Sequence, residues 1–379
     1  MDNLTHSLLG AALARTPLGK LHPKSTLLLV IAANLPDLDI VSLLGGKETY
    51  LVQHRGITHS VFGVAAQIVL MAAVVRAWEA WRAQRGGARA SSWRDLLLLC
   101  GAGLASHPLL DYLNTYGVRP WLPFDATWYY GDLVFIVDPW LWLIFGGVAA
   151  SVGPRSRTGD VWLGIAALLG SFVIYDPFGL FAASPAPFFF GLVWLIAVLA
   201  IAFVRAFGGG IVRPSLTLAL GAALTATYLT GLARERASAA LVARDAVRQK
   251  KPQDESIVDL VCMPQPCDPR HWWVLVETES AIYLWGLDVG DIARTDKHSK
   301  DPSVERALSE PCTTWWRSFA RIRYAELTQV DQGTFVRLLD ARYDAPWCTA
   351  TVLIQPDGTA LCLDERSGSP PPPPLPSAR

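Results

Sequence analysis

The segment FFFGLVWLIAVLAIAFV, residues 188–204, contains no charged side chain and is almost entirely apolar. A helix that crosses the hydrocarbon core of a bilayer needs roughly 20 mostly apolar residues. Five further apolar segments approach this length, at residues 60–75, 96–110, 133–152, 161–181 and 215–233. Six such segments in series, with short connections between them, predict a polytopic α-helical membrane domain over residues 1–233.

The density of charged residues divides the chain into two parts. Residues 1–233 contain 27 Asp, Glu, Lys and Arg, whereas the 146 residues of 234–379 contain 39. The whole chain has 33 basic and 33 acidic residues and no basic stripe, so we expect no nucleic-acid partner. We predict a water-soluble domain over residues 234–366 and a disordered proline-rich tail over 367–379.

The distribution of arginine between the loops predicts an orientation, because cytoplasmic loops collect Lys and Arg. Arginines concentrate in the loops at 76–95, 153–160 and 205–214, and the loops between them are nearly free of basic residues. We therefore expect the C-terminal domain and the loops at 111–132 and 182–187 to lie outside the cytoplasm.

The C-terminal domain has the period of β-strands. Strand-like runs lie at 256–262, 271–277, 281–287, 335–341 and 350–355, and Pro356-Asp357-Gly358 is a hairpin signal. These runs predict a small β-rich (α+β) domain. Five of the six cysteines lie here, at 262, 267, 312, 348 and 362, and in an oxidising compartment they allow at most two disulfides.

Five of the seven histidines lie within the first 107 residues, together with several aspartates. Imidazole and carboxylate are the usual ligands of zinc and related divalent ions. His107 and Asp111 are four residues apart and share one helix face, provided that Pro108 does not interrupt the helix. We therefore consider a metal site.

Two further pairs of ligand-type residues precede this one. Asp37 and Asp39 share one side of a segment in which Pro36 ends regular helix. His54 and His59 lie on either side of a glycine that would let the loop bring both rings together. Ionisable groups at membrane depth cost several kcal/mol unless they are paired, so we expect these residues to be functional.

Four motifs resemble those of a known family: Asp2-x-x-Thr5-His6, Pro36-Asp37-x-Asp39, His54-Arg55-Gly56-x-Thr58-His59-Ser60 and His107-x-x-x-Asp111. The family is that of the inner-membrane metal-dependent hydrolases, also called LexA-binding, inner membrane-associated hydrolases. The resemblance covers about residues 1–140, and the His-Arg-Gly-x-Thr-His-Ser run is its most specific element. The family is itself distantly similar to zinc-dependent phospholipase C and P1-type nucleases.

The resemblance implies a multi-pass inner-membrane hydrolase with a divalent metal ion, for which we expect zinc. Its ligands would be drawn from His6, Asp37, Asp39, His54, His59, His107 and Asp111. Asp39 is also a candidate general base, Arg55 a candidate clamp for an anionic substrate group, and Asn114 a candidate supporting residue. The expected substrate is a lipid or small-molecule ester or phosphoester at the outer membrane face.

Two other classes of function remain open at this point. The chain could be a non-catalytic membrane protein with a structural metal and a partner-binding soluble domain. It could also be an ion-coupled transporter, since buried Asp and His residues form ion pathways. The Pro-Asp-x-Asp segment has no inverted repeat in the later spans, which counts against transport. The family name also suggests LexA as a partner. Contact with LexA would require a cytosolic surface, whereas the predicted orientation places the C-terminal domain outside the cytoplasm.

Overall fold

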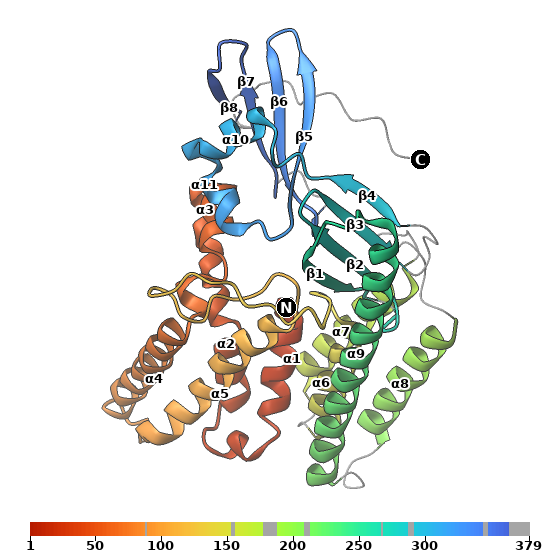
Figure 1. Cartoon of the computed structure of the whole chain (residues 1–379). Coiled ribbons are helices and arrows are strands. Elements are labelled where there is room, and N and C mark those ends of the chain that lie inside the picture. Colours follow the sequence, from red (N-terminus) through yellow and green to blue (C-terminus); the bar gives the residue numbers. More distant parts are fainter. Residues whose placement is uncertain are drawn as a thin grey trace. The chain divides into compact units, whose positions relative to one another are not determined.

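The computed structural model describes residues 1–87, 89–152, 156–176, 188–207, 213–266, 268–286, 292–343 and 348–363 (Figure 1). The chain divides into two compact units. The first comprises Met1–Asp39, Arg55–Ala239 and Cys262–Trp273, and the second comprises Ile40–His54, Ala240–Val261 and Val274–Arg379. The predicted proline-rich tail lies outside the described residues.

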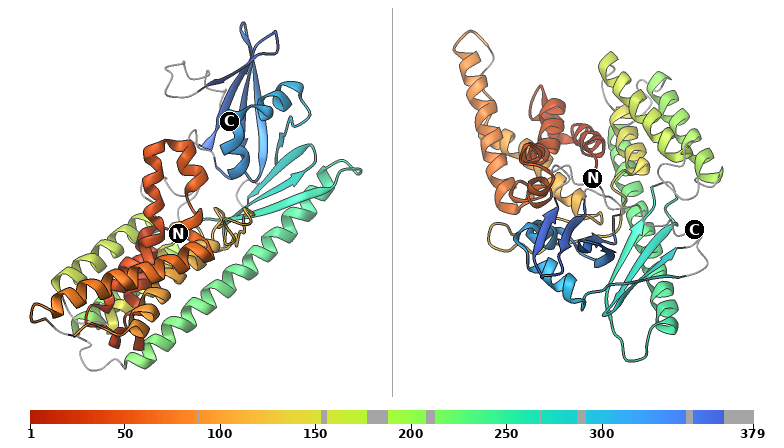
Figure 2. Two further views of the ribbon diagram at one scale, coloured as in Figure 1. Left: turned by 90° about the vertical axis from the view of Figure 1, so that its left-hand side faces the viewer. Right: turned by 90° about the horizontal axis from the view of Figure 1, so that it is seen from above.

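The first unit is a bundle of α-helices. Its helices are α1 (Asn3–Leu13), α2 (Ser25–Asn34), α4 (Val61–Ala83), α5 (Trp93–Tyr112), α6 (Pro139–Val152), α7 (Arg157–Tyr175), α8 (Phe188–Phe207) and most of α9 (Pro214–Lys250). Three 3₁₀ segments connect the early helices: η1 (Pro17–Lys20), η2 (Leu35–Gly45, shared with the second unit) and η3 (Ile57–His59). The last predicted span forms part of α9, a single helix of 37 residues, visible as a long green ribbon in Figure 2.

Five segments of the described chain are long and apolar enough to cross a membrane. They are Ser25–Gly45, Val61–Ala83, Arg157–Tyr175, Phe188–Phe207 and Pro214–Lys250. Two of the six predicted spans are not among them. α6 has only 14 residues. α5 packs one face against the bundle, with Leu96, Leu99, Cys100 and Leu104 fully buried, and leaves Leu97, Leu98 and Leu109 exposed. An apolar run that is buried by neighbouring helices has the composition of a span, so its sequence alone does not distinguish the two.

Close approach of the helix backbones places α2 between α1 and α5. A Cβ atom on Gly103 of α5 would lie 2.5 Å from the Cβ of Ala32 in α2, and one on Gly10 of α1 would lie 2.8 Å from the carbonyl oxygen of Leu29. Both glycines are therefore required for α1, α2 and α5 to pack at this distance. The packing brings the end of α2 against the last turns of α5.

Side-chain caps fix where two of these helices begin. Asp2 accepts a hydrogen bond from the backbone N–H of Thr5 (3.0 Å) and caps α1. Ser60 accepts one from Gly63 (3.0 Å) and caps α4. Residues Asp2, Thr5 and Ser60 of the quoted motifs therefore have local structural roles, because a cap satisfies N–H groups that the first helical turn leaves unpaired.

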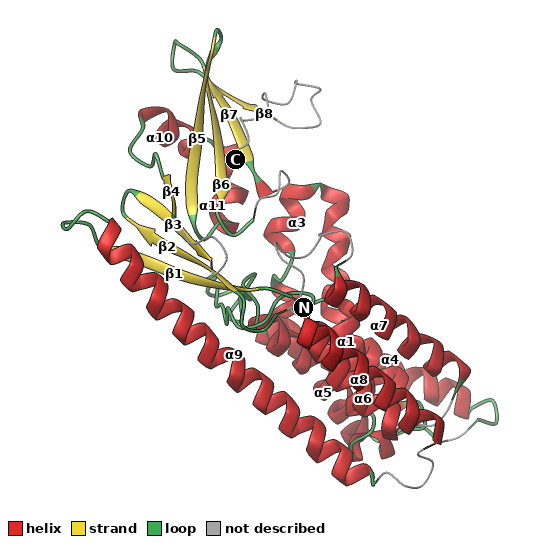
Figure 3. Ribbon diagram, turned by 90° about the vertical axis from the view of Figure 1, so that its right-hand side faces the viewer, coloured by secondary structure: helices red, strands yellow, loops and turns green. Residues whose placement is uncertain are grey.

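The described part of the C-terminal region contains two four-stranded sheets, drawn in yellow in Figure 3. One has the order β1-β2-β3-β4 and the other β5-β6-β7-β8. The strands are β1 (Ile257–Pro264), β2 (Trp272–Thr278), β3 (Ala281–Gly286), β4 (Ala293–Asp296), β5 (Arg323–Val330), β6 (Gly333–Asp340), β7 (Ala350–Ile354) and β8 (Ala360–Leu363). Short helices α3 (Lys47–Gln53), α10 (Pro302–Ser309) and α11 (Thr314–Phe319) and the 3₁₀ turn η4 (Pro311–Thr313) belong to the second unit.

The five predicted strand runs correspond to β1, β2, β3, β6 and β7, and the predicted Pro-Asp-Gly turn joins β7 to β8. The sequence did not predict β4, β5 and β8. β4 and β8 have four residues each, and β4 is exposed along its length, so neither shows an alternation of apolar and polar residues. β5 pairs antiparallel with β6 over eight residues, from Arg323 opposite Asp340 to Val330 opposite Gly333.

One disulfide joins Cys312 of η4 to Cys362 of β8. Cys100 and Cys348 are free and buried, Cys262 is buried, and Cys267 lies outside the described residues. Burial raises the pKa of the Cys348 thiol to about 11, so this thiol stays protonated in the folded protein. Free thiols are therefore best counted after denaturation.

The substitution Cys312→Ser is expected to raise the number of free thiols in the denatured, unreduced protein by one, because it releases Cys362 from the disulfide. Titration with a chromogenic thiol reagent measures this count. Cys348→Ser is the control and should lower the count by one. If Cys312→Ser also lowers the count by one, Cys312 and Cys362 are not joined by a disulfide in the native protein.

Candidate metal centre

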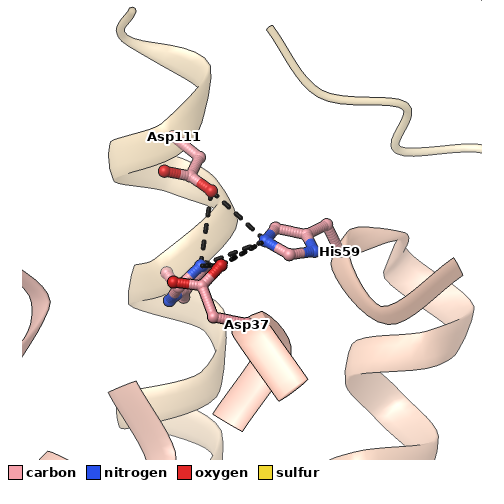
Figure 4. Close-up of side chains that lie close together, drawn as sticks. Asp37, His59 and Asp111 are labelled. Carbon is pink, nitrogen blue, oxygen red and sulfur yellow. Dashed lines mark hydrogen bonds and ion pairs between the residues drawn. The ribbon is translucent and has the colours of Figure 1, made fainter. Parts of the chain in front are cut away.

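Four side chains from three segments converge beside the last two turns of α5. Asp37 lies in η2, His59 ends η3, and His107 and Asp111 belong to α5. Each offers one donor atom, and the four donor atoms lie within 4.8 Å of one another. Figure 4 shows the side chains of Asp37, His59 and Asp111 pointing toward one another.

Helix α5 continues through Pro108, so this proline does not separate His107 from Asp111. Proline removes one backbone hydrogen bond from a helix interior, yet α5 extends to Tyr112. His107 and Asp111 therefore stay one turn apart on the same face. His107 Nε2 lies 3.3 Å from Asp111 Oδ2.

The distances among the donor atoms fit a tetrahedral ion. His59 Nε2 and His107 Nε2 are 3.1 Å apart. Asp37 Oδ1 lies 3.4 and 3.3 Å from these two nitrogens, and Asp111 Oδ2 lies 3.3 Å from both. Five of the six distances between donors are therefore 3.1–3.4 Å, and the sixth, between Asp37 and Asp111, is within 4.8 Å. A regular tetrahedron with edges of about 3.3 Å would hold an ion about 2.0 Å from each donor, the length of Zn–N and Zn–O bonds.

Burial and charge at the cluster favour a cation. The side chains of His59, His107 and Asp111 are buried, and that of Asp37 is 18% exposed. Asp111 Oδ2 is buried without a hydrogen bond from the described residues, and such an atom requires an explanation, of which an ion is one. Burial by itself lowers the pKa of His59, but the nearby carboxylates of Asp111, Asp37 and Asp39 outweigh it and raise the pKa to about 10. The carboxylates thus stabilise positive charge at this position.

Contacts behind the two imidazoles orient their Nε2 atoms toward the cluster. His107 Nδ1 lies 2.6 Å from the carbonyl oxygen of Ala33. That oxygen can only accept, so Nδ1 carries the proton and Nε2 presents its lone pair to the centre. His59 Nδ1 lies 3.3 Å from Asp39 Oδ2 and 3.0 Å from Thr58 Oγ1. This is the arrangement of a metal-bound histidine that a carboxylate holds from behind.

Asp39 therefore lies on the far side of the His59 ring from the four donors. Its Oδ2 accepts hydrogen bonds from the backbone N–H of Arg55 (2.9 Å) and from Thr58 Oγ1 (3.1 Å). The sequence predicts Asp39 as a ligand or general base. That prediction stays open, and these contacts give Asp39 a further role as a residue that orients His59.

Arg55 is 1% exposed and points into the protein. Its Nη2 lies 3.1 Å from Asp111 Oδ1, and its Nη1 donates to Asn114 Oδ1 (2.8 Å) and to the carbonyl oxygen of Gly117 (3.2 Å). Arg55 has a left-handed φ of 53°, a conformation that non-glycine residues adopt only where surrounding contacts hold it. These contacts favour Arg55 and Asn114 as residues that position Asp111, rather than as a clamp for substrate.

Two predicted ligands lie outside the four-donor set. His6 is fully buried and its ring stacks on that of His107, with centroids 3.7 Å apart. His6 Nε2 lies 3.4 Å from Asp111 Oδ1, the carboxylate oxygen that faces away from the other imidazoles, and neither ring nitrogen has a hydrogen-bond partner in the described chain. His54 follows α3 in the second unit, where its ring stacks on that of Tyr50 at 4.7 Å.

Sequence reasoning missed two contacts of the cluster. The carbonyl oxygen of Ala33 is a backbone group, so no residue type marks it. Asn3 donates from Nδ2 to Asp37 Oδ2 (2.9 Å). Asn3 directly follows the capping residue Asp2, so the sequence could have placed it at the start of α1, next to the predicted ligand His6.

Comparison with known proteins supports the membrane assignment. Residues 1–180 match the model of a family described as YdjM inner membrane protein. A protein of Bacillus subtilis (strain 168), named uncharacterized protein YfhP, is 26% identical over 151 residues. The match covers 38% of this chain and 43% of that protein, so the chain spans less than half the length of this curated relative. No solved structure matches.

The family match includes all four residues of the cluster. Together with the five candidate membrane segments, it supports a multi-pass inner-membrane protein with a His/Asp cluster that can bind a metal ion. The expected likeness to phospholipase C and P1-type nucleases stays a prediction.

Proposed function

We propose that the chain is a membrane-bound metal-dependent hydrolase that cleaves an ester or phosphoester of a lipid-like substrate at the outer membrane face. The observation that carries this proposal is the set of two imidazole and two carboxylate donors around one tetrahedral position. A mixed nitrogen and oxygen set of this size is typical of zinc. The expected occupancy is one ion per chain.

His59, His107 and Asp111 would hold the ion, because all three are buried and each is fixed from behind. Catalytic zinc sites commonly use three protein ligands and leave a fourth position for water. A bound divalent ion lowers the pKa of that water toward neutrality and polarises the ester or phosphoryl oxygen. Asp37 is the partly exposed member, so we place it beside the fourth position rather than in it, where its carboxylate would accept the proton of the attacking water.

An exposed apolar patch beside the cluster supports a lipid-like substrate. We define this interfacial patch as Ile57, Val61, Phe62, Trp121 and Phe124, all of which are exposed. Ile57 lies two residues before His59. Phe124 is 81% exposed, and its ring contacts that of Phe62 at 5.1 Å. Because α4 is a candidate membrane segment that begins at Val61, the patch continues its apolar surface, and aromatic residues at such a boundary are typical of the lipid–water interface.

Of the two alternative functions, the geometry gives more support to a structural metal site than to ion transport. Four protein donors can also close the shell of a structural ion, which supports a non-catalytic metal site as the second candidate. Transport has less support. Ion pathways place such groups near the bilayer midplane, and of the four cluster residues only Asp37 lies within a candidate membrane segment, Ser25–Gly45. His59, His107 and Asp111 lie at the ends of η3 and α5.

The substitution Asp37→Asn separates these roles. It is expected to leave metal in the protein but to lower hydrolysis at least 100-fold, since loss of a general base typically costs a factor of about 100 to 10,000. The measurements are metal content by mass spectrometry of the detergent-purified chain and hydrolysis of p-nitrophenyl esters, bis(p-nitrophenyl) phosphate and short-chain phospholipids. The control is Asp254→Asn, at an exposed aspartate of the second unit.

Two results would contradict the proposal. If the metal-loaded wild-type protein hydrolyses none of these probes, the structural-metal candidate is favoured. If Asp37→Asn loses the ion as completely as a histidine variant does, Asp37 is an essential ligand and cannot be the base.

A further inference from the structure

A groove lies between α6, α7 and α8, away from the metal centre. It encloses 440 Å³, within the range of about 300–1,000 Å³ that is usual for small-molecule sites. Small residues create this space, since Gly147 of α6, Gly164 of α7 and Ala202 of α8 all line it. The rest of the lining is mainly apolar. Because α7 and α8 are candidate membrane segments, we expect the groove to face lipid rather than water.

The length of the groove fits one leaflet. On α8 its lining extends from Trp194 to Arg205. Eleven helical steps of about 1.5 Å make a length of about 16 Å, close to half of the roughly 30 Å thickness of the hydrocarbon core. A single extended acyl chain would therefore occupy it along the direction of the helices.

One end of the groove is positively charged. Arg205 pairs with Asp160 (Nε to Oδ1, 2.8 Å) and donates from Nη1 to the carbonyl oxygen of Ala150 (3.0 Å). Arg157 lies in the same turn of α7 as Asp160. Arg15 has a buried Nε without a hydrogen-bond partner in the described chain, and burial together with the charge of Arg205 lowers its pKa. Arg205 contacts this carboxylate directly, and Arg15 and Arg157 add two further positive charges near it.

We propose that this groove binds one acyl chain of an anionic phospholipid, with its phosphate against the guanidinium groups of Arg15 and Arg205. Charge complementarity favours this occupant over a neutral lipid, because the excess of positive charge lies at the end where a headgroup would emerge. The loops that carry Arg157 and Arg205 are those the sequence predicts to be cytoplasmic, and the cytoplasmic leaflet is the one rich in anionic lipid.

The groove can be filled without disturbing the helices. A Cβ atom on Gly164 would meet nothing within 4 Å, so Gly164→Leu places its side chain into the groove. Gly231 of α9 is equally unobstructed and does not line the groove, which makes Gly231→Leu a matched control. Leucine has a higher helix propensity than glycine, so neither change opposes helix formation.

The test is native mass spectrometry of the delipidated full-length chain, titrated with phosphatidylglycerol or with phosphatidylcholine. The expected result is one phosphatidylglycerol per chain, bound at least tenfold more tightly than phosphatidylcholine. Gly164→Leu should weaken this binding at least tenfold, Gly231→Leu should leave it unchanged, and Arg15→Gln should remove the preference between the two lipids. Ala167→Leu, which also fills the groove, serves as a second variant should Gly164→Leu fail to fold.

Three results would overturn the proposal. Gly164→Leu and Ala167→Leu could both bind phosphatidylglycerol as the wild type does. The wild type could show no preference between the two lipids. The lipid-free chain could form a dimer that Gly164→Leu disrupts, which would assign the groove to a second copy of the chain.

Discussion

The substitution His107→Ala is expected to reduce the metal content of the purified protein from one ion per chain to less than a tenth of that value. His107 Nε2 is within 3.3 Å of all three other donor atoms, so its loss leaves two carboxylates and one imidazole around a larger space. Even residues that only orient a ligand change metal affinity by about 10- to 100-fold, and loss of a ligand should cost more. Metal analysis after dialysis against buffered zinc measures the effect.

His22→Gln is the matched control for this experiment. His22 is also buried in the first unit, but it pairs with Glu79 (Nε2 to Oε1, 2.7 Å), so its replacement should leave the metal content unchanged. Asp39→Asn gives an intermediate case, since it weakens only the contact behind His59 and should lower zinc affinity by about 10- to 100-fold. Full metal content in His107→Ala would show that the protein does not bind its metal ion at this cluster. The proposed hydrolase function would then be wrong as well.

The sequence predicted parts of the cluster because their spacing is local. His107 and Asp111 were identified together from the helical repeat alone, and this pair needed only that α5 continue through Pro108. The approach of Asp37 to His59 could not be derived in this way. It depends on the packing of α2 against α5, where Gly103 meets Ala32, and such contacts between distant segments leave no periodic signal.

The roles of Asp39 and Arg55 show a different limit. Residue type indicated that both have the right chemistry for catalysis, but the direction of each side chain decides what it does. The turn at Arg55 sends its guanidinium toward Asp111 and its backbone N–H toward Asp39, so both residues support ligands. A positive φ at an arginine is not encoded by residue type, and the sequence instead suggested that the neighbouring glycine makes the turn.

The substitution Arg55→Met is expected to destabilise the first unit by about 3–5 kcal/mol, the usual cost of removing one partner from a buried ion pair. It leaves Asp111 Oδ1 without its guanidinium and removes the guanidinium donor from the oxygens of Asn114 and Gly117. Arg55→Lys should recover only part of the loss, because one ammonium group cannot reach acceptors that the planar guanidinium contacts on two nitrogens. Thermal unfolding in detergent, with metal content measured on the same samples, reports both effects.

Arg248→Met is the control for this prediction. Arg248 pairs with Asp245 at 3.3 Å, but both side chains are more than half exposed, so this pair should contribute less than about 1 kcal/mol. The two roles of Arg55 then predict different outcomes. A positioning residue loses stability and metal together when it is replaced. If Arg55→Met instead keeps the stability and the ion of the wild type, and only raises the KM for an anionic probe, the guanidinium must reach the substrate despite its burial, and the clamp inferred from its residue type is the correct role.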